Sequence, residues 1–382
     1  MFEVVENTAS GTVIKVIGVG GAGGNAVDHM IRNGVAGVEF ITANTDGQAL
    51  SRTQAKNQIQ LGSTGLGAGA RPEAGRAAAL EAREQIADAL RGSHMAFITA
   101  GMGGGTGTGA APVVAEVAKE MGILTVAVVT KPFSFEGVRR MQSAETGIAE
   151  LSQHVDSVIV ILNEKLEDVL GDDVSMEEAF SAADSVLKNA VAGISEIINV
   201  PGLINVDFQD VRTVMAEQGM AMMGSAASSG VDRARIAAEQ AVACPLLEGV
   251  NLSGARGVVV NITANKSSLK LRETKEVMNT IRGFAADDAT IIFGAVYDDP
   301  IGEELRVTVI ATGLGQPQIA RQSKPKLVQK TGTDNLPVGV DYRVLDEMPA
   351  VIRKNRASTI EALQNSGVDK YDIPAFLRKQ AD

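Results

Sequence analysis

Two glycine-rich stretches each follow an apolar run and precede a helical pattern. The first, GVGGAGGNAV, spans residues 18–27, and the second, GMGGGTGTGA, spans 101–110. Glycine lets the backbone turn tightly and approach a ligand, and a helix that starts there presents free N–H groups to an anion. A third stretch, GLGAGARPEAG (65–75), follows another apolar run. Three such loops at one sheet edge predict a site for a nucleoside di- or triphosphate.

The first stretch alone also fits the G-x-G-x-x-G dinucleotide fingerprint, from Gly18 to Gly23. An NAD-dependent dehydrogenase is therefore an alternative. Two features disfavour it: the second strand ends in Asn44 and Asp46 in place of an acidic residue at its tip, and a second glycine loop is present. Because no G-x-x-x-x-G-K-[ST] motif supplies a P-loop lysine, we expect Mg²⁺ to neutralise the phosphates.

Up to about residue 165, apolar β-branched runs alternate with helical patterns such as 72–91 and 110–121. This alternation predicts a parallel sheet with helices on both faces, and right-handed crossovers bring the loops that follow the strands to one edge. Strands are expected at 12–19, 38–43, 57–61, 94–100, 123–129 and 156–162.

A long helix is expected from Met176 to Val200, where apolar residues recur at a spacing of three and four, and Pro201-Gly202 ends it. A second α/β region with an antiparallel or mixed sheet follows. Its helices are expected near 208–217, 231–243 and 269–282, and its strands at 256–264, 289–297 and 304–311. Residues 316–370 have the composition of a flexible linker, and 371–382 regain apolar and basic residues typical of a peptide ligand. The alternative for that tail is a frayed end.

The net charge of −11 is uneven along the chain. From Gln316 to Asp382, 11 basic and 8 acidic residues give +3, so the 24 basic and 38 acidic residues before them give −14. An acidic body argues against general nucleic-acid binding. The single Cys244, expected to pack in a core, fits a reducing cytoplasm, and neither a signal peptide nor an apolar run long enough to span a membrane is apparent.

The stretch GGGTGTG (103–109) resembles the tubulin/FtsZ family, in particular its bacterial cell-division GTPases. VTKPFSFEGVRR (129–140), NVDFQDVRTVM (205–215) and the terminal DIPAFLRKQAD agree, and the resemblance covers Val13–Gly315. It implies an α/β fold with a Rossmann-like parallel-sheet GTPase domain, a long central helix, a smaller α/β domain with a mixed sheet, and a disordered linker. The implied divisions are an N-terminal extension (1–11), a GTP-binding domain (12–175), the central helix (176–200), a GTPase-activating domain (201–315), the linker (316–370) and the terminal peptide (371–382).

The resemblance implies roles for individual residues around GTP, GDP and Mg²⁺, the metal being held through the phosphates and water. Phe180 would stack on guanine, and Asp184 would accept hydrogen bonds from the base. From the residues alone, Phe180 is better read as core and Asp184 as solvated. The implied GTP-binding residues are Gly20, Gly21, Ala22, Gly23, Gly24, Asn25, Asn44, Asp46, Gly69, Ala70, Gly103, Gly104, Gly105, Thr106, Gly107, Thr108, Gly109, Glu136, Arg140, Asn163, Phe180 and Asp184.

Asn205, Asp207 and Asp210 are implied catalytic residues that act on the GTP of the neighbouring subunit, with the two aspartates orienting the attacking water. The residues alone indicate a plainer role. Asn205 or Asp207 is a typical helix N-cap, and Asp210 would favour the helix dipole. Arg71 stands where many members of the family have Asn, and it could add a cation near the phosphates or point to solvent.

The resemblance further implies a cytoplasmic homopolymer that forms a mid-cell ring at the inner face of the membrane, without inserting into it. The terminal peptide would bind division proteins such as FtsA, ZipA and MinC. Its expected contacts are Asp372, Ile373, Pro374, Phe376, Leu377, Arg378 and Lys379. The alternatives are a tubulin-like protein for plasmid segregation or cell shape, which the terminal peptide disfavours, and a non-hydrolysing homologue, which Asn205, Asp207 and Asp210 disfavour.

Overall fold

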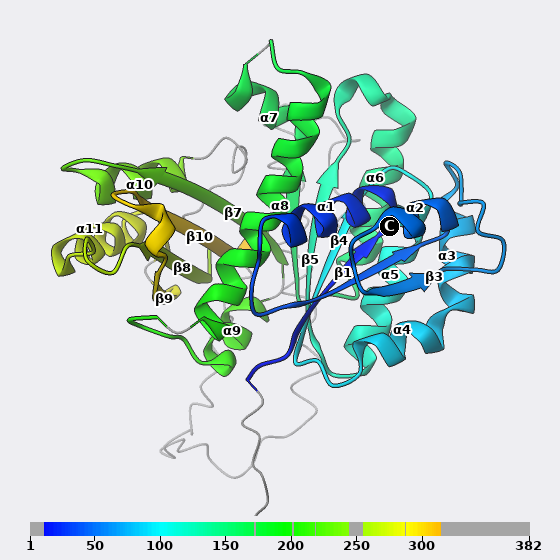
Figure 1. The fold of residues 1–382 in the computed structure, drawn as a ribbon, viewed down its shortest axis with the longest axis horizontal. Helices are drawn as coiled ribbons and strands as arrows, with labels where there is room; N and C mark the ends of the chain where they lie inside the picture. Colours follow the sequence, from blue (N-terminus) through cyan, green and yellow to red (C-terminus); the bar gives the residue numbers. More distant parts are fainter. Residues whose placement is uncertain are drawn as a thin grey trace, which may run out of the picture. The chain divides into compact units, whose positions relative to one another are not determined.

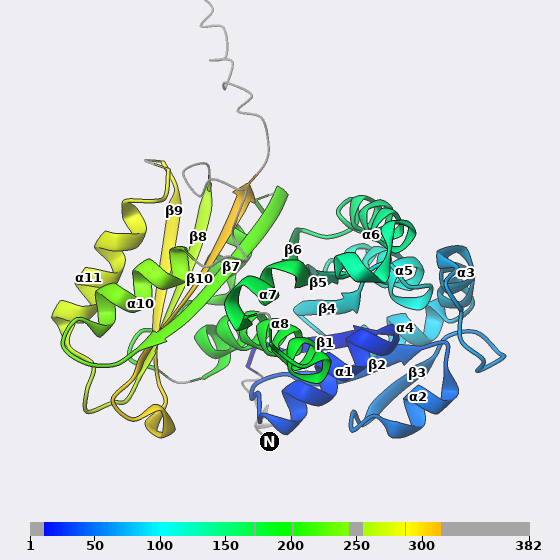
Figure 2. The same ribbon diagram turned by 90° about the horizontal axis from the view of Figure 1, so that it is seen from above.

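A computed structural model describes residues 11–171, 173–200, 202–217, 219–243, 255–286 and 288–314. Cys244, the expected linker (316–370) and the terminal peptide (371–382) lie outside these residues. The strands form one ten-stranded sheet in the order β3-β2-β1-β4-β5-β6-β7-β10-β8-β9, seen from two sides in Figures 1 and 2. The strands are β1 (Ile14–Val19), β2 (Glu39–Asn44), β3 (Asn57–Gln60), β4 (Met95–Gly101), β5 (Leu124–Lys131), β6 (Ser157–Leu162), β7 (Gly219–Ser228), β8 (Gly257–Ala264), β9 (Thr290–Tyr297) and β10 (Leu305–Leu314).

Helices cover both faces of the first half of this sheet, as Figure 2 shows. Alternate residues of β1 point to opposite faces: Ile14 and Val16 join a core with α1, α8 and α9, whereas Ile17 and Val19 join a core with α3, α4, α5 and α6. The helices are α1 (Gly20–Arg32), α2 (Gly47–Arg52), α3 (Pro72–Glu81), α4 (Arg83–Leu90), α5 (Thr106–Glu120), α6 (Val138–Leu151), α7 (Asn163–Leu170), α8 (Met176–Asn199), α9 (Phe208–Met215), α10 (Arg233–Val242) and α11 (Leu271–Arg282), with short 3₁₀ turns at Ser134–Glu136 and Asp299–Ile301.

The expected α/β fold with a mixed sheet is confirmed. Strands β1 to β7 run parallel, and β10 is antiparallel to both β7 and β8. The two halves form one continuous sheet because β6 pairs with β7. Helix α8 packs against strands of both halves, since its Leu187 and Ile194 share a core with Ile159 of β6 and Ile310 of β10.

Three elements differ from the sequence expectation. Strand β7 was not expected, because its sequence GMAMMGSAAS carries no β-branched residue and therefore lacks the usual strand signal. The helix expected over 72–91 is broken at Ala82 into α3 and α4. Helix α5 begins at Thr106, inside the second glycine loop and not at 110, which places its N-terminus within the candidate site.

Candidate nucleotide-binding site

The three glycine-rich loops pack against one another, backbone to backbone, at the carboxyl ends of β1, β3 and β4. Gly20 has φ +76°, and a Cβ built there would lie 2.9 Å from the Gly107 nitrogen. A Cβ on Gly105 would overlap the Gly69 carbonyl oxygen and lie 3.1 Å from the Arg71 nitrogen. These positions need glycine because neighbouring backbone occupies the space of a side chain. The loops therefore form one interlocked platform.

A second group of glycines in the same loops is open. A Cβ on Gly21, Gly24, Gly69 or Gly104 would meet nothing within 4 Å. All four are predicted GTP-binding residues, and Ala22 and Asn25, next to Gly21 and Gly24 on the first two turns of α1, are exposed. A bare backbone at a helix N-terminus, free of side chains, is suited to phosphate. The residues present therefore fit the phosphates of the expected nucleotide.

Two threonines of the second loop use their hydroxyls differently. Thr108 is buried, and its Oγ1 accepts a hydrogen bond of 2.8 Å from the Gly103 nitrogen. It stabilises the loop itself. The Thr106 Oγ1 lies 2.6 Å from the Oγ1 of Thr45, in the turn after β2. Thr45 was not among the predicted residues, although it lies within the quoted NTD stretch.

Asn44 and Asp46 flank Thr45 and have local structural partners. The Asn44 Oδ1 accepts a hydrogen bond of 3.2 Å from the Asp46 nitrogen, and Asn44 is buried. Asp46 is the N-cap of α2, where its Oδ1 accepts from the nitrogens of Gln48 and Ala49. The two residues therefore shape the turn beside the platform.

The loop after β5 carries Glu136 and Arg140, which form an ion pair of 2.9 Å. Glu136 also accepts a hydrogen bond of 3.0 Å from the Phe133 nitrogen, and Glu164 accepts one of 2.8 Å from the Ser134 nitrogen. Carboxylates thus fix the first part of this loop, at Phe133 and Ser134. Glu164 and Phe133 are further residues that sequence reasoning missed, although Phe133 lies in the quoted stretch VTKPFSFEGVRR.

Phe180 and Asp184 lie on α8 one turn apart. Phe180 is 42% exposed and meets the Phe133 ring edge to face, with centroids 5.4 Å apart. It is thus not a core residue. Asp184 is half-buried, and burial raises the pKa of its carboxyl to about 6, while the Arg32 guanidinium opposes that shift. An aromatic face beside a desolvated carboxylate suits a purine base that presents N–H donors.

Asn163, the first residue of α7, is buried, and its Oδ1 has no hydrogen-bond partner. A buried amide oxygen without a partner is costly. A ligand that donates a hydrogen bond would satisfy it, which agrees with the predicted GTP contact. Among the described residues, no group of three or more His, Cys, Asp or Glu side chains could hold a metal ion directly.

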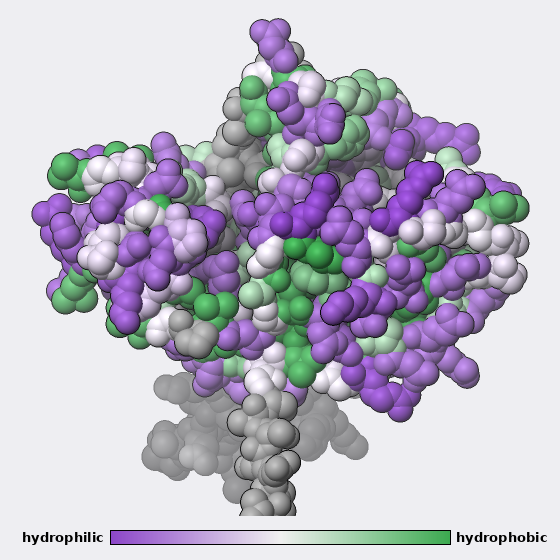
Figure 3. All heavy atoms as spheres, in the orientation of Figure 1, coloured by the Kyte–Doolittle hydropathy of each residue, from purple (hydrophilic) through white to green (hydrophobic). Residues whose placement is uncertain are grey.

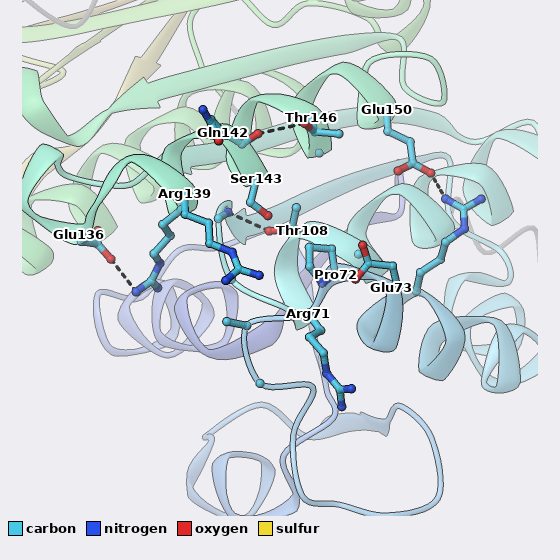
Figure 4. A pocket seen from close by; sticks show the side chains of 18 of the residues that line it. Arg71, Pro72, Glu73, Thr108, Glu136, Arg139, Gln142, Ser143, Thr146 and Glu150 are labelled. Carbon is cyan, nitrogen blue, oxygen red and sulfur yellow. Dashed lines mark hydrogen bonds and ion pairs between the residues drawn. The ribbon is translucent and has the colours of Figure 1, made fainter.

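A groove of about 860 Å³ lies beside the platform, between α3 and α6, with the start of α5 as its floor (Figure 4). Its lining includes six predicted GTP-binding residues of the second and third loops, among them Gly69 and Gly104, together with Glu136 and Arg140. Arg71 belongs to this lining as well. The groove does not reach Phe180 or Asp184, so it is an extension of the phosphate platform and not the pocket for a base.

The predicted catalytic residues lie at the opposite end of the sheet. Helix α8 starts beside the platform and, at about 1.5 Å per residue, covers roughly 36 Å. Asn199, its last residue, donates to the carbonyls of Thr12 and Gly37, which precede β1 and β2. In Figure 1, α7 lies at one end of α8 and α9 at the other. Asn205, Asp207 and Asp210 thus cannot reach the glycine loops of their own chain.

This far loop, residues 202–210, is held by its own side chains. The Asn205 amide accepts from the Gly202 nitrogen at 2.9 Å and donates to the Val200 carbonyl at 2.7 Å. Asp207 is the N-cap of α9, and its Oδ1 accepts from the Gln209 and Asp210 nitrogens at 2.7 and 3.0 Å. The helix-capping role expected of Asp207 from the sequence alone is therefore confirmed. Its second oxygen and the Asp210 carboxylate have no partner within the described residues, and both side chains are exposed.

Comparison with known proteins assigns both halves of the chain. Residues 13–171 match the GTPase domain of the tubulin/FtsZ family, and 219–315 match the C-terminal domain of the FtsZ family. The chain is 56% identical to the cell division protein FtsZ of Pseudomonas aeruginosa and 54% identical to that of Azotobacter vinelandii, each over the full length of both chains.

Solved structures agree. An empty FtsZ dimer from M. jannaschii, 44% identical, matches with a TM-score of 0.76 over 80% of this chain and 88% of that one. CetZ2 from Haloferax volcanii, solved as a nucleotide-bound protofilament, is 20% identical and matches with a TM-score of 0.67 over 80% of this chain and 95% of that one. At this identity the match is evidence only for the fold.

Proposed function

The chain belongs to the tubulin/FtsZ family, and from that premise we propose that it is a GTPase that assembles head to tail into the filaments of bacterial cell division. Its full-length relatives are named cell division proteins, which favours this function over plasmid segregation, cell shape or a dehydrogenase. GTP binds at the glycine platform and is hydrolysed to GDP and phosphate.

One observation carries the assembly step: the platform and the far loop lie at opposite ends of one subunit. Asn199 marks the far end and Phe133, against Phe180, marks the near end. If copies stack in one direction, the far loop of one copy faces the platform of the next. Such a head-to-tail contact does not close on itself and propagates into a filament. Hydrolysis then depends on assembly.

Exposed apolar side chains at both ends support such a contact. Leu66 is 88% exposed and follows β3, Phe135 and Val138 follow β5, and Met176 follows β6, all at the platform end. Leu203 is exposed at the far end. Hydrophobic residues are visible near α7 at the top of Figure 3. Apolar surface of this kind is stabilised by covering it with a partner, here another copy.

The base is recognised by the half-buried carboxylate on α8. Guanine presents the N1–H and N2–H₂ donors, which Asp184 accepts, whereas adenine presents no such pair. Phe180 stacks on the base, and Glu136 and Arg140 lie near the ribose. When bound together with the phosphates, Mg²⁺ would supply charge neutralisation at the transferred phosphoryl group. Thr106 and the open glycine backbones bind the phosphates.

The attacking water is oriented by the far loop of the neighbouring copy. Asp207 uses one oxygen to cap α9 and keeps the other available, and Asp210 has a free carboxylate within the described residues. Two exposed carboxylates on a rigid turn can hold a water molecule and accept its proton. Asn205 keeps the turn rigid through its two backbone contacts.

The test is right-angle light scattering with GTP, GDP, ATP or NAD added in turn to the purified full chain. Scattering that rises with GTP only, and decays as phosphate is released, supports the proposal. Scattering with ATP, or NAD binding without scattering, would refute it.

We further propose that the domain divisions given above hold, and that the terminal peptide binds membrane-anchored division proteins at the inner face of the membrane, at mid-cell. FtsA, ZipA and MinC are the expected partners. None of the described helices is long and apolar enough to cross a bilayer. Deleting residues 371–382 should leave GTPase activity and assembly nearly unchanged while abolishing co-sedimentation with such partners. Loss of assembly would instead place the peptide in the filament contact.

A further inference from the structure

Thr45 links the second and third glycine-rich loops. Its side chain is only 4% exposed, and its Oγ1 lies 2.6 Å from the Thr106 Oγ1 at the start of α5. Its carbonyl oxygen accepts a hydrogen bond of 3.0 Å from the Gly67 nitrogen in the third loop. The next residue, Asp46, pairs with Leu66 in an isolated β-bridge. Thr45 therefore contacts the second loop through its side chain and the third through its backbone.

We propose that Thr45 is a positioning residue that directs the hydroxyl hydrogen of Thr106 toward the nucleotide phosphates. A hydroxyl group has one hydrogen and two lone pairs. In the pair of threonines, one hydroxyl donates and the other accepts. When Thr45 donates, Thr106 accepts and keeps its own hydrogen for a phosphate oxygen. This inference rests on the proposed function, because it takes Thr106 to be a phosphate ligand.

The charge of the ligand favours this direction of the pair. An ionised phosphate oxygen accepts hydrogen bonds strongly and cannot donate one. The arrangement in which the Thr106 hydroxyl donates to the phosphate is therefore the more stable one. A hydroxyl that also accepts a hydrogen bond is polarised and becomes a better donor. Thr45 does this from a buried position. Its backbone contact with Gly67 does not involve the hydroxyl, so a substitution can remove one link and keep the other.

The test uses equilibrium binding of GTP to the full chain, below the concentration at which it assembles. Thr45→Val removes the hydroxyl and should weaken GTP binding by about fivefold, the size expected for one hydrogen bond. Thr45→Ser keeps the hydroxyl and should bind within about twofold of the wild type. Thr42→Val is the matched control, since Thr42 lies buried on β2 and its Oγ1 has no hydrogen-bond partner. It should bind GTP as the wild type does.

A double-mutant cycle shows whether Thr45 acts through Thr106. Thr106→Val should itself weaken GTP binding, and adding Thr45→Val should weaken it no further. Additive losses, or wild-type binding by Thr45→Val, would overturn the inference. If Thr45→Val unfolds, Thr45→Ser and Thr45→Ala, which differ by the hydroxyl alone, serve in its place, and equal binding by those two would overturn it. A wild-type chain that does not bind GTP would contradict the proposed function instead.

Discussion

The platform end and the far loop are built by opposite means. At the platform, glycines such as Gly105 let three backbones touch, and a side chain has no room. At the far loop, polar side chains such as Asn205 and Asp207 hold the turn, and carboxylates are exposed. The platform is a complete anion site within one chain. The far loop gains its function only beside a second copy.

The largest effect is expected from a methyl group inside the interlocked platform. Gly105 has φ −79° and ψ −60°, so alanine suits its backbone, but a Cβ would overlap the Gly69 carbonyl. Gly105→Ala should lower the free energy of unfolding by about 3 kcal/mol, because backbone cannot move aside cheaply. Gly104→Ala, with open space around it, should keep the thermal unfolding midpoint and weaken GTP binding instead. Equal midpoints for the two variants would contradict the interlocked platform.

The second prediction concerns the far loop. Asp210→Ala should retain GTP binding and assembly, while GTP turnover falls about 100-fold, as expected when a positioned proton acceptor is removed. The cap of α9 survives because Asp207 accepts from the backbone nitrogen of residue 210. Gln209→Ala, an exposed neighbour, is the control and should turn over GTP normally. Normal turnover by assembled Asp210→Ala would remove Asp210 from the mechanism.

The platform and the far loop also differ in how far their structure and function could be predicted from the sequence. The glycine pattern predicted the platform because each interlocked glycine is a packing requirement. The far loop reads as a helix cap, and the structure contains that cap; only the family resemblance suggested catalysis. Strand β7 was missed for lack of β-branched residues, and Thr45 was missed because its partner Thr106 is 61 residues away. Contacts of that range follow from the folded sheet and have no local pattern.

The third prediction tests base recognition at the platform end. Asparagine in place of Asp184 offers one donor and one acceptor, so it mismatches the two donors of guanine and matches xanthine. Asp184→Asn should weaken GTP binding more than tenfold, in the range for hydrogen bonds to a charged group, and should improve the binding of xanthosine triphosphate. If Asp184→Asn still prefers GTP to xanthosine triphosphate as the wild type does, Asp184 does not contact the base.

The smallest effect is the pH dependence of GTP binding. The pKa of Asp184 is raised to about 6, so its carboxyl group is ionised at pH 7.5. At about pH 5, one unit below this pKa, only about a tenth of the carboxyl groups remain ionised. GTP binding should therefore weaken about tenfold from pH 7.5 to pH 5. Phosphate titrates in the same range, so Asp184→Asn, which lacks the carboxyl, provides the control and should show a flatter profile. Identical profiles would contradict the assignment.

The stability of the nucleotide-free protein should depend on pH in the opposite direction from GTP binding. The folded carboxyl of Asp184 keeps its proton up to about pH 6, whereas its ordinary value is 3.8. Stability without nucleotide should thus fall as pH rises from about 4 to about 6, because an ionised, desolvated carboxylate is costly.

The central claim is that each active site combines the platform of one copy with the far loop of the next. Mixing two defective variants tests it most directly. Asp210→Ala keeps the platform and lacks the catalytic loop, and Asp184→Ala keeps the loop and lacks base recognition. GTP turnover of an equal mixture should rise well above the sum of the two separate rates. A mixture that stays at that sum, while light scattering and labelled subunits show mixed filaments, would contradict the claim.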